Sequence, residues 1–302
     1  MKPGFMIYTL MFFLTLLGAS CEKETFNQPD PIKIPEPEKP VTGYKIDLSN
    51  WKITLPVDQN NDNSPDEYGP SQLKDFGYRN VSALKPFLYD DFTDSSLVFY
   101  TYPGGATTTN SSYPRTELRE QMTPGSNSNN WTLAQGGTME GVLKIDDISK
   151  DNSTSSYENS RVIVMQIHGI VSPGDVTKYN LSSNHAPPLL KMTWVDGHLI
   201  AYKKSLKDES TSGAALYDES SATWTDIKHD FGAINKSMTT VKIKASSGKL
   251  VVTVNGVSHT FNDVSLQKWP FENYFKAGSY LISTDANTFA KVKYYSLKVS
   301  HP

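Results

Sequence analysis

The 302-residue chain lacks cysteine pairs, a strong charge of either sign and amphipathic helices. Cys21 is the single cysteine, which excludes an intrachain disulfide and a cysteine-rich zinc site. The 29 Lys and Arg nearly balance the 32 Asp and Glu, so no general field attracts phosphates and nucleic acid is not an expected partner. Any polyanionic partner must therefore be met by a local basic patch.

The first 20 residues have the composition of an export leader. One lysine precedes an apolar run that ends at Leu17 and is too short to span a bilayer comfortably. Small residues then lead to Cys21, which resembles a bacterial lipoprotein box in which that cysteine is lipidated. We expect a signal peptide over residues 1–20 and a lipid anchor to the bacterial cell envelope, at the outer membrane or cell surface. The alternatives are an incidental cysteine after an ordinary cleaved leader, and secretion.

Residues 21–42 are predicted to form a disordered tether. Five prolines and eight charged residues between Glu22 and Thr42 leave too little apolar surface to offset the ordering entropy. From residue 43 to residue 302 the composition changes to hydrophobic runs separated by Gly, Asn and Pro. We therefore expect one folded domain over residues 43–302.

This domain is predicted to be all-β. Runs rich in β-branched and aromatic residues recur at 95–102, 141–145, 161–168, 240–245, 249–254 and 291–299. Asp196-Gly197 and Asn255-Gly256 each separate two such runs and suit type I′ hairpin turns. Many short antiparallel strands without internal repeats predict a jelly-roll β-sandwich. The stretches 104–112, 124–130 and 172–188 are expected to be loops.

Three predicted strands, Tyr113–Gln121, Arg161–His168 and Tyr274–Ile282, carry polar residues on one face. Side chains alternate across a strand with period two, so each strand can be sorted into faces. The polar faces hold Arg115, Glu117, Arg119 and Gln121, then Gln166 and His168, then Tyr274, Lys276, Gly278 and Tyr280. The opposite faces hold Leu118, then Ile163, Met165 and Ile167, then Phe275, Ala277 and Leu281.

If these strands are neighbours, their polar faces form a cationic groove that contains a proton-transfer pair. Taken singly, these residues could also have a purely structural role. Arg115, Glu117 and Arg119 suit an ion-pair ladder that holds the sheet, and His168 taken alone suits a structural histidine. His185, His198, His229, His259 and His301 show no ligand spacing and are expected to be surface or structural residues.

The three segments also resemble a known family. The motifs YPRTELRE, QIH and YFKAGSY are similar, in order and spacing, to the signature blocks of the alginate lyases of polysaccharide lyase family 7. The resemblance implies a concanavalin-like jelly roll in which Arg115, Gln166, His168 and Tyr280 are catalytic. Glu117, Arg119, Tyr274 and Lys276 would bind substrate. The chain departs from the family at Leu281-Ile282, where Asn-Gln is common, which leaves the subsite beside Tyr280 open.

The implied reaction is β-elimination in a uronate polymer, which leaves a 4,5-unsaturated sugar. Negative charge develops on the carboxyl group after the C5 proton leaves, and Arg115 and Gln166 are donors that can stabilise it. Tyr280 would protonate the leaving O4, and Lys276 or Arg119 is expected to supply the cation beside it. The resemblance implies that His168 is the base for guluronate, whereas Tyr280 serves as both base and acid for mannuronate.

Further expectations complete this interpretation. No metal or cofactor is required, and the protein is expected to act as a monomer on alginate. The motif QIH, with Ile167 in the middle, resembles the motif of family members that accept guluronate. Guluronate-rich or mixed blocks are therefore the expected substrate. The alternatives are a lyase for another polyuronate such as glucuronan, a non-catalytic surface carbohydrate-binding protein, and a retaining glycoside hydrolase. The hydrolase needs two close carboxylates, for which no suitable run exists.

Overall fold

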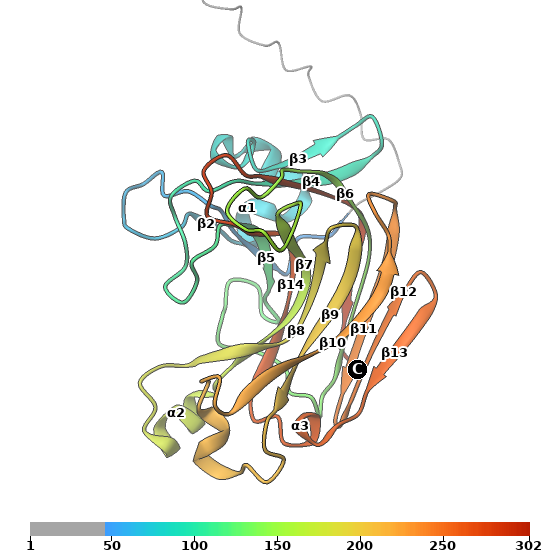
Figure 1. Ribbon diagram of the computed structural model, residues 1–302. Helices are drawn as coiled ribbons and strands as arrows, with labels where there is room; N and C mark the ends of the chain where they lie inside the picture. The colour runs from blue at the N-terminus through green and yellow to red at the C-terminus, as the bar shows by residue number, and fades with distance from the viewer. Residues whose placement is uncertain (1–45) are drawn as a thin grey trace, which may run out of the picture. The chain divides into compact units, whose positions relative to one another are not determined.

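A computed structural model describes residues 46–302, which form two antiparallel β-sheets packed face to face (Figure 1). The all-β sandwich predicted from the spacing of short strands is confirmed. The predicted signal peptide, Cys21 anchor and tether lie outside the described residues and stay predictions. No helix within residues 46–302 is long and apolar enough to cross a membrane.

The front sheet, as we call the eight-stranded one, carries all three predicted polar strands. Its members are β1 Trp51–Thr54, β2 Glu67–Tyr68, β5 Arg115–Glu120, β7 Arg161–Ile170, β8 His185–Val195, β9 His198–Leu206, β10 Trp224–Ala233 and β14 Glu272–Ile282. Their order in the sheet is β10-β9-β8-β7-β14-β5-β1-β2. The three polar strands β7, β14 and β5 are therefore direct neighbours.

The back sheet has seven strands and closes the other side of the core. They are β3 Leu88–Asp91, β4 Ser96–Thr101, β6 Gly137–Ile148, β11 Thr239–Ser246, β12 Lys249–Val254, β13 Val257–Phe261 and β15 Ala290–Ser300, in the order β13-β12-β11-β6-β15-β4-β3. Along β11 buried and exposed residues alternate almost strictly, as expected for a sheet with one face in the core. The two inner faces meet in one continuous hydrophobic core.

Helices are short, as the lack of helical periodicity predicts. They are α1 Pro70–Leu73, α2 Pro173–Tyr179 and α3 Val264–Gln267, with 3₁₀ turns η1 Lys74–Asn80, η2 Ser82–Leu84 and η3 Gly213–Tyr217. The expectation of a loop over 172–188 is wrong in part, because α2 lies inside it and β8 begins within it. Ser172 caps α2 by accepting a hydrogen bond from the Asp175 amide, and Pro173 suits the first helical position.

Both predicted hairpin turns are confirmed. Asp196 and Gly197 have φ values of 45° and 93°, and Asn255 and Gly256 have values of 48° and 84°. Positive φ at both central positions is the requirement of a type I′ turn. The first of these turns joins β8 to β9, and the second joins β12 to β13.

A bulge where β7 meets β14 corrects one predicted face. Met165 pairs with Ala277 and Ile163 pairs with Tyr280, so β14 advances three residues while β7 advances two. The alternation also breaks within β7, where Val164 and Met165 both enter the core. Ile163 therefore does not share the core face with Met165, as predicted, but lies on the outer face of the front sheet.

The Tyr294 hydroxyl satisfies backbone groups at this bulge from the opposite sheet. Tyr294 stands on β15, accepts a hydrogen bond from the Gly278 amide at 3.1 Å and donates one to the Val164 carbonyl. Gly278 itself has φ of 144°, and a Cβ there would lie 2.5 Å from the Thr116 carbonyl oxygen. The bulge thus requires a glycine in β14 and a hydroxyl from the back sheet.

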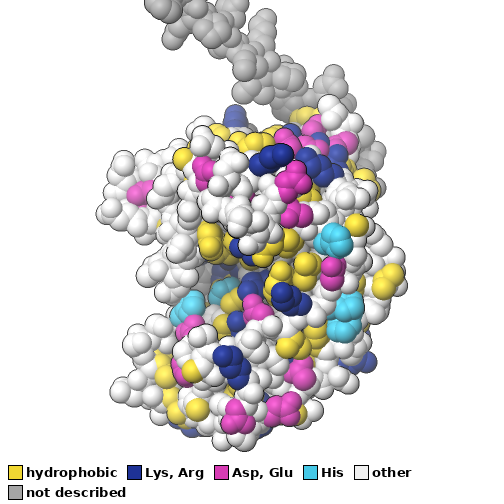
Figure 2. All heavy atoms as spheres, in the orientation of Figure 1, with side chains coloured by type: hydrophobic (Ala, Val, Ile, Leu, Met, Phe, Trp, Pro, Cys, Tyr) yellow, Lys and Arg dark blue, Asp and Glu magenta, His cyan; other side chains and the backbone are white. Residues whose placement is uncertain are grey.

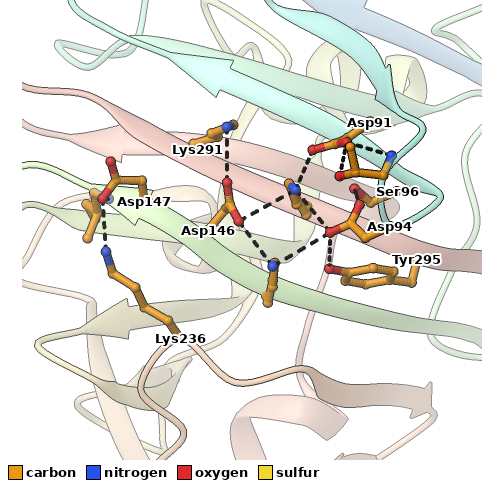
Figure 3. A network of polar contacts seen from close by, with 12 residues as sticks. Asp91, Asp94, Ser96, Asp146, Asp147, Lys236, Lys291 and Tyr295 are labelled. Atoms are coloured by element: carbon orange, nitrogen blue, oxygen red, sulfur yellow. Dashed lines mark hydrogen bonds and ion pairs between the residues drawn. The ribbon is translucent and has the colours of Figure 1, made fainter.

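On the outer side of the back sheet, lysines and aspartates form an ion-pair network (Figure 3). The Lys293 ammonium lies between Asp91 and Asp94, at 2.6 and 3.0 Å. Asp146 extends the network to Lys291, at 3.1 Å. Each of these lysines has a carboxylate partner, so this network carries no surplus of positive charge.

His301, near the C-terminal end, hydrogen-bonds two acceptors. His301 Nε2 lies 2.7 Å from Glu120 Oε1, and its Nδ1 lies 3.0 Å from the Gly136 carbonyl oxygen. A carboxylate and a carbonyl accept hydrogen bonds, so both contacts are made only by the doubly protonated ring. Burial opposes the charge, but the bonds to Glu120 and Gly136 raise the pKa of His301 above its ordinary value.

This arrangement predicts a pH-dependent contribution to stability. A folded-state pKa above the unfolded one stabilises the protein below the unfolded pKa, and the gain is lost as the pH rises through the folded pKa. The melting temperature of His301→Gln should therefore fall below that of wild type by several degrees at pH 5.5 and by less at pH 9. His198→Gln, at a half-exposed pair with Asp230, is the control and should change little. An equal deficit for His301→Gln at both pH values would contradict the assignment.

Candidate active site

A cleft of about 700 Å³ crosses the outer face of the front sheet. Figure 2 shows it as the hollow at the left of the molecule, with Lys and Arg side chains in its depth. Every strand of the front sheet contributes to its lining, together with the loop residues Thr108, Thr109 and Asn110. Six Lys or Arg line it against two carboxylates, Glu67 and Asp226. A chain of net charge −3 thus has the local basic patch that a polyanion requires.

The structure brings together seven of the eight residues that sequence analysis places in the active site. Arg115, Arg119, Gln166, His168, Tyr274, Lys276 and Tyr280 all line this cleft. The strand register sets them side by side, since Lys276 pairs with both Arg119 and Gln166. Likewise Tyr274 pairs with His168, and Tyr280 pairs with Arg115.

Glu117 is the exception, and the expectation that it contacts substrate is corrected. Its side chain is fully buried beneath the cleft and is absent from the lining. The carboxylate instead contacts three lining residues: Gln166 Nε2 at 2.5 Å, Lys276 Nζ at 2.5 Å and Arg115 Nη1 at 3.3 Å. Period two predicts the face of a residue but not its depth, and longer neighbouring side chains cover this carboxylate.

Glu117 determines which way the Gln166 amide points. An ionised carboxylate only accepts hydrogen bonds, so the NH₂ group of Gln166 must face Glu117. One of the two amide hydrogens is used in this bond. The other is left for a ligand above the floor of the cleft.

His168 is held as a neutral imidazole. Its Nδ1 lies 2.8 Å from the carbonyl oxygen of Gly169, so Nδ1 carries the hydrogen and Nε2 keeps its lone pair. Burial, together with the positive charge of Lys276, holds the pKa of His168 well below its ordinary value. The ring stacks on Tyr274, with centroids 5.3 Å apart. His168 is therefore neutral at neutral pH, with the lone pair of Nε2 available.

Burial lowers the pKa of Lys276 to about 8, against the opposing effect of Glu117. Its side chain lines the cleft and is 10% exposed, and its ammonium pairs with Glu117, which lies beneath the floor. At neutral pH the group remains mostly cationic. Its charge contributes to the positive potential in the cleft and keeps His168 neutral.

The cation beside Tyr280 is Arg115, rather than the expected Lys276 or Arg119. The Arg115 guanidinium lies over the Tyr280 ring, 4.0 Å from its centroid, and the Tyr280 hydroxyl hydrogen-bonds Ser111 Oγ at 2.7 Å. Arg119 instead lies 4.0 Å over the Tyr274 ring and donates to Asn130. Among the described residues, the buried Nε of Arg115 has no hydrogen-bond partner.

Some lining residues were missed by sequence analysis. His185, expected to be a surface or structural residue, lines the cleft, pairs with Glu219 and has its ring 6.2 Å from that of His168. Ile282 lines it beside Tyr280, whereas Leu281 is buried in the core. Lys191 and Tyr202 also line the cleft. They stand on strands flanking a predicted turn, and sorting those strands into faces would have found them.

Within residues 46–302 no group of three or more His, Cys, Asp or Glu is arranged to hold a metal ion. The arrangement instead offers fixed cationic and amide donors, a neutral histidine and a tyrosine in one groove. Such a groove suits a reaction on an acidic polymer in which the carboxylate charge is stabilised while a proton is transferred from the sugar ring. Fold and cleft together define a β-sandwich polysaccharide lyase.

Comparison with known proteins identifies the family. A family model described as alginate lyase matches residues 46–301, nearly the whole described region. An alginate lyase of Klebsiella pneumoniae is 25% identical over 296 residues, covering 87% of this chain and 92% of that protein. The chain belongs to the alginate lyase family.

Solved structures agree with this assignment. Alginate lyase A1-II′, described as a member of polysaccharide lyase family 7, is 30% identical with a TM-score of 0.63, over 85% of this chain and 96% of that one. A double variant of A1-II′ in complex with the substrate GGMG is 28% identical with a TM-score of 0.62, over 84% and 93%. The jelly roll expected from the resemblance is thereby confirmed.

Proposed function

We propose that this protein cleaves alginate by β-elimination, with Arg115, Gln166, His168 and Tyr280 as its catalytic residues. The observation that supports this best is the convergence of these four side chains in one cationic cleft. Two of them, Arg115 and Gln166, are held from below by the buried Glu117. The complexes of A1-II′ with a GGMG substrate and a GGG product support alginate as the polymer.

Arg115 and Gln166 neutralise the uronate carboxyl group. Removal of the C5 proton places negative charge on this group, and stabilising it there lowers the barrier. Arg115 supplies a permanent charge with an unpartnered buried Nε, and Gln166 supplies its second amide hydrogen. Both side chains are fixed before substrate binds, so little reorganisation is needed during the reaction.

His168 and Tyr280 move the protons. On guluronate the C5 proton and the leaving O4 lie on opposite sides of the ring, so Nε2 of His168 takes the proton while Tyr280 donates to O4. The C4–O bond breaks and the electron pair from C5 forms the 4,5 double bond. On mannuronate both groups lie on one side, and Tyr280 serves as base and then acid. The Arg115 guanidinium lies over the Tyr280 ring, 4.0 Å from the centroid.

Two alternatives have less support. A retaining glycoside hydrolase needs two carboxyl groups about 5–5.5 Å apart. The two carboxylates that line this cleft, Glu67 and Asp226, stand on the opposite edge strands β2 and β10. A non-catalytic binding protein would need the cationic groove but not a neutral histidine and a tyrosine positioned within it.

The first test removes charge stabilisation and proton donation separately. Arg115→Ala and Tyr280→Phe should each reduce turnover by at least ~100-fold, because each removes a group that acts in the transition state. Turnover is followed by the ultraviolet absorbance of the unsaturated uronate, which only a lyase produces. Tyr89→Phe, on β3 of the back sheet, is the matched control and should retain wild-type rates. A folded Arg115→Ala or Tyr280→Phe with near-normal turnover would remove that residue from the mechanism.

We also propose that guluronate-rich or mixed blocks are preferred. Ile167 is fully buried in the core, so it can act only by setting how far Gln166 and His168 stand from the sugar. One methylene in a packed core is worth about 1 kcal/mol, so a bias rather than an absolute selection is expected.

Initial rates on purified guluronate and mannuronate blocks test this preference. Wild type should act faster on guluronate, and His168→Ala should abolish that activity because the base is lost. Some mannuronate cleavage through Tyr280 should survive in the same variant. A wild-type preference for mannuronate, or equal loss on both blocks in His168→Ala, would contradict the assignment.

We further propose that the protein is exported and held at the cell envelope by a lipid on Cys21, and that it acts as a monomer. The support is the leader composition and the small residues before Cys21. In cells that make the full chain, the protein should partition into detergent with the membrane fraction, and Cys21→Ser should abolish this partitioning. Wild-type protein found wholly in the aqueous phase would refute the anchor.

A further inference from the structure

One row of side chains crosses the front sheet at right angles to its strands. Each member pairs with the next across neighbouring strands, in the order Lys52, Arg119, Lys276, Gln166, Lys191, Tyr202 and Lys228. Five of the seven are cations. Since paired strands lie about 4.8 Å apart, the row presents a charged or polar group at nearly every such step.

Only the central part of this row takes part in the mechanism above. Beyond Gln166 the row continues through Lys191 and Tyr202, which line the cleft, to Lys228. The partly exposed Tyr202 ring has the ammonium groups of Lys191 and Lys228 each 5.7 Å from its centroid. The Tyr202 ring, which lies between two lysines, has no role in the reaction proposed at Gln166 and His168.

The surroundings of Tyr202 favour an anion. Lys191 and Lys204 share Asp226, at 2.8 and 2.6 Å, so this carboxylate neutralises only one of them. Arg161 also acts electrostatically on Tyr202 and lines the cleft. The carboxylates around the ring, Asp226 and Asp230, are outnumbered by the four cationic side chains.

We propose that Tyr202 is the platform of a distal sugar-binding subsite for the uronate chain, with Lys191 and Lys228 binding the carboxylate of the sugar that stacks on it. A pyranose ring offers an apolar face for stacking on the phenol ring, and its carboxylate reaches the flanking ammonium groups. Tyr202 stands two strands from Gln166, about 10 Å and roughly the length of two sugar units. This inference rests on the proposed function, because it extends the path of the same polymer.

The subsite predicts an effect that depends on chain length. Tyr202→Ala should raise KM for hexasaccharides and longer chains about five- to tenfold, the usual range for one lost aromatic contact, and leave kcat unchanged. Disaccharides that bind at the reactive centre should show the wild-type KM, since a single further unit does not reach Tyr202. Tyr202→Phe should retain the wild-type KM on long chains, because the ring and not the hydroxyl forms the platform. Lys228→Ala should raise KM on long chains by a smaller factor.

Tyr89→Ala on the back sheet is the matched control for truncation of a tyrosine. Unchanged KM on long chains in Tyr202→Ala would overturn the subsite, and so would an equal loss on short and long chains. These results leave the proposed function standing if wild type still forms the unsaturated product. Absence of that product in wild type would instead refute the proposed function.

Discussion

The geometry of the cleft depends on one buried carboxylate. Glu117 lies under the floor and holds Gln166, Lys276 and Arg115 together from below. A buried charge costs several kcal/mol unless well-placed partners compensate it, and here three donors do so. Conversely, without Glu117 the ammonium and the guanidinium would repel each other at close range. The carboxylate and its donors therefore stabilise each other in one arrangement.

The two sheets use similar residues in different ways. On the outer side of the back sheet one network of lysines has aspartate partners, and the charges within it are balanced (Figure 3). In the front cleft six cations face two carboxylates. Overall charge hides this difference, because it sums over both faces. A weakly acidic protein can thus bind an acidic polymer on one side of its sandwich.

Sequence alone predicted the sandwich and both hairpin turns, and seven of the eight residues that it placed in the active site line the cleft. It succeeded because long strands with one polar face follow period two. It misplaced Ile163, since a bulge depends on how neighbouring strands pair and leaves no local signal. It expected Glu117 in the cleft because alternation gives a face and not a depth. His185 stands after a Ser- and Asn-rich stretch without periodicity, and only the folded chain shows that Glu219 and His168 surround it.

Tyr294 links the catalytic face to the opposite side of the molecule. Its hydroxyl reaches through the core to the bulge that sets Ile163 beside Tyr280. Tyr294 lies on β15, far from the cleft, yet its hydrogen bonds help to fix the position of strands β7 and β14 that line the cleft. In protein engineering, position 294 should be kept fixed with the active site, even in libraries meant to vary only the back sheet.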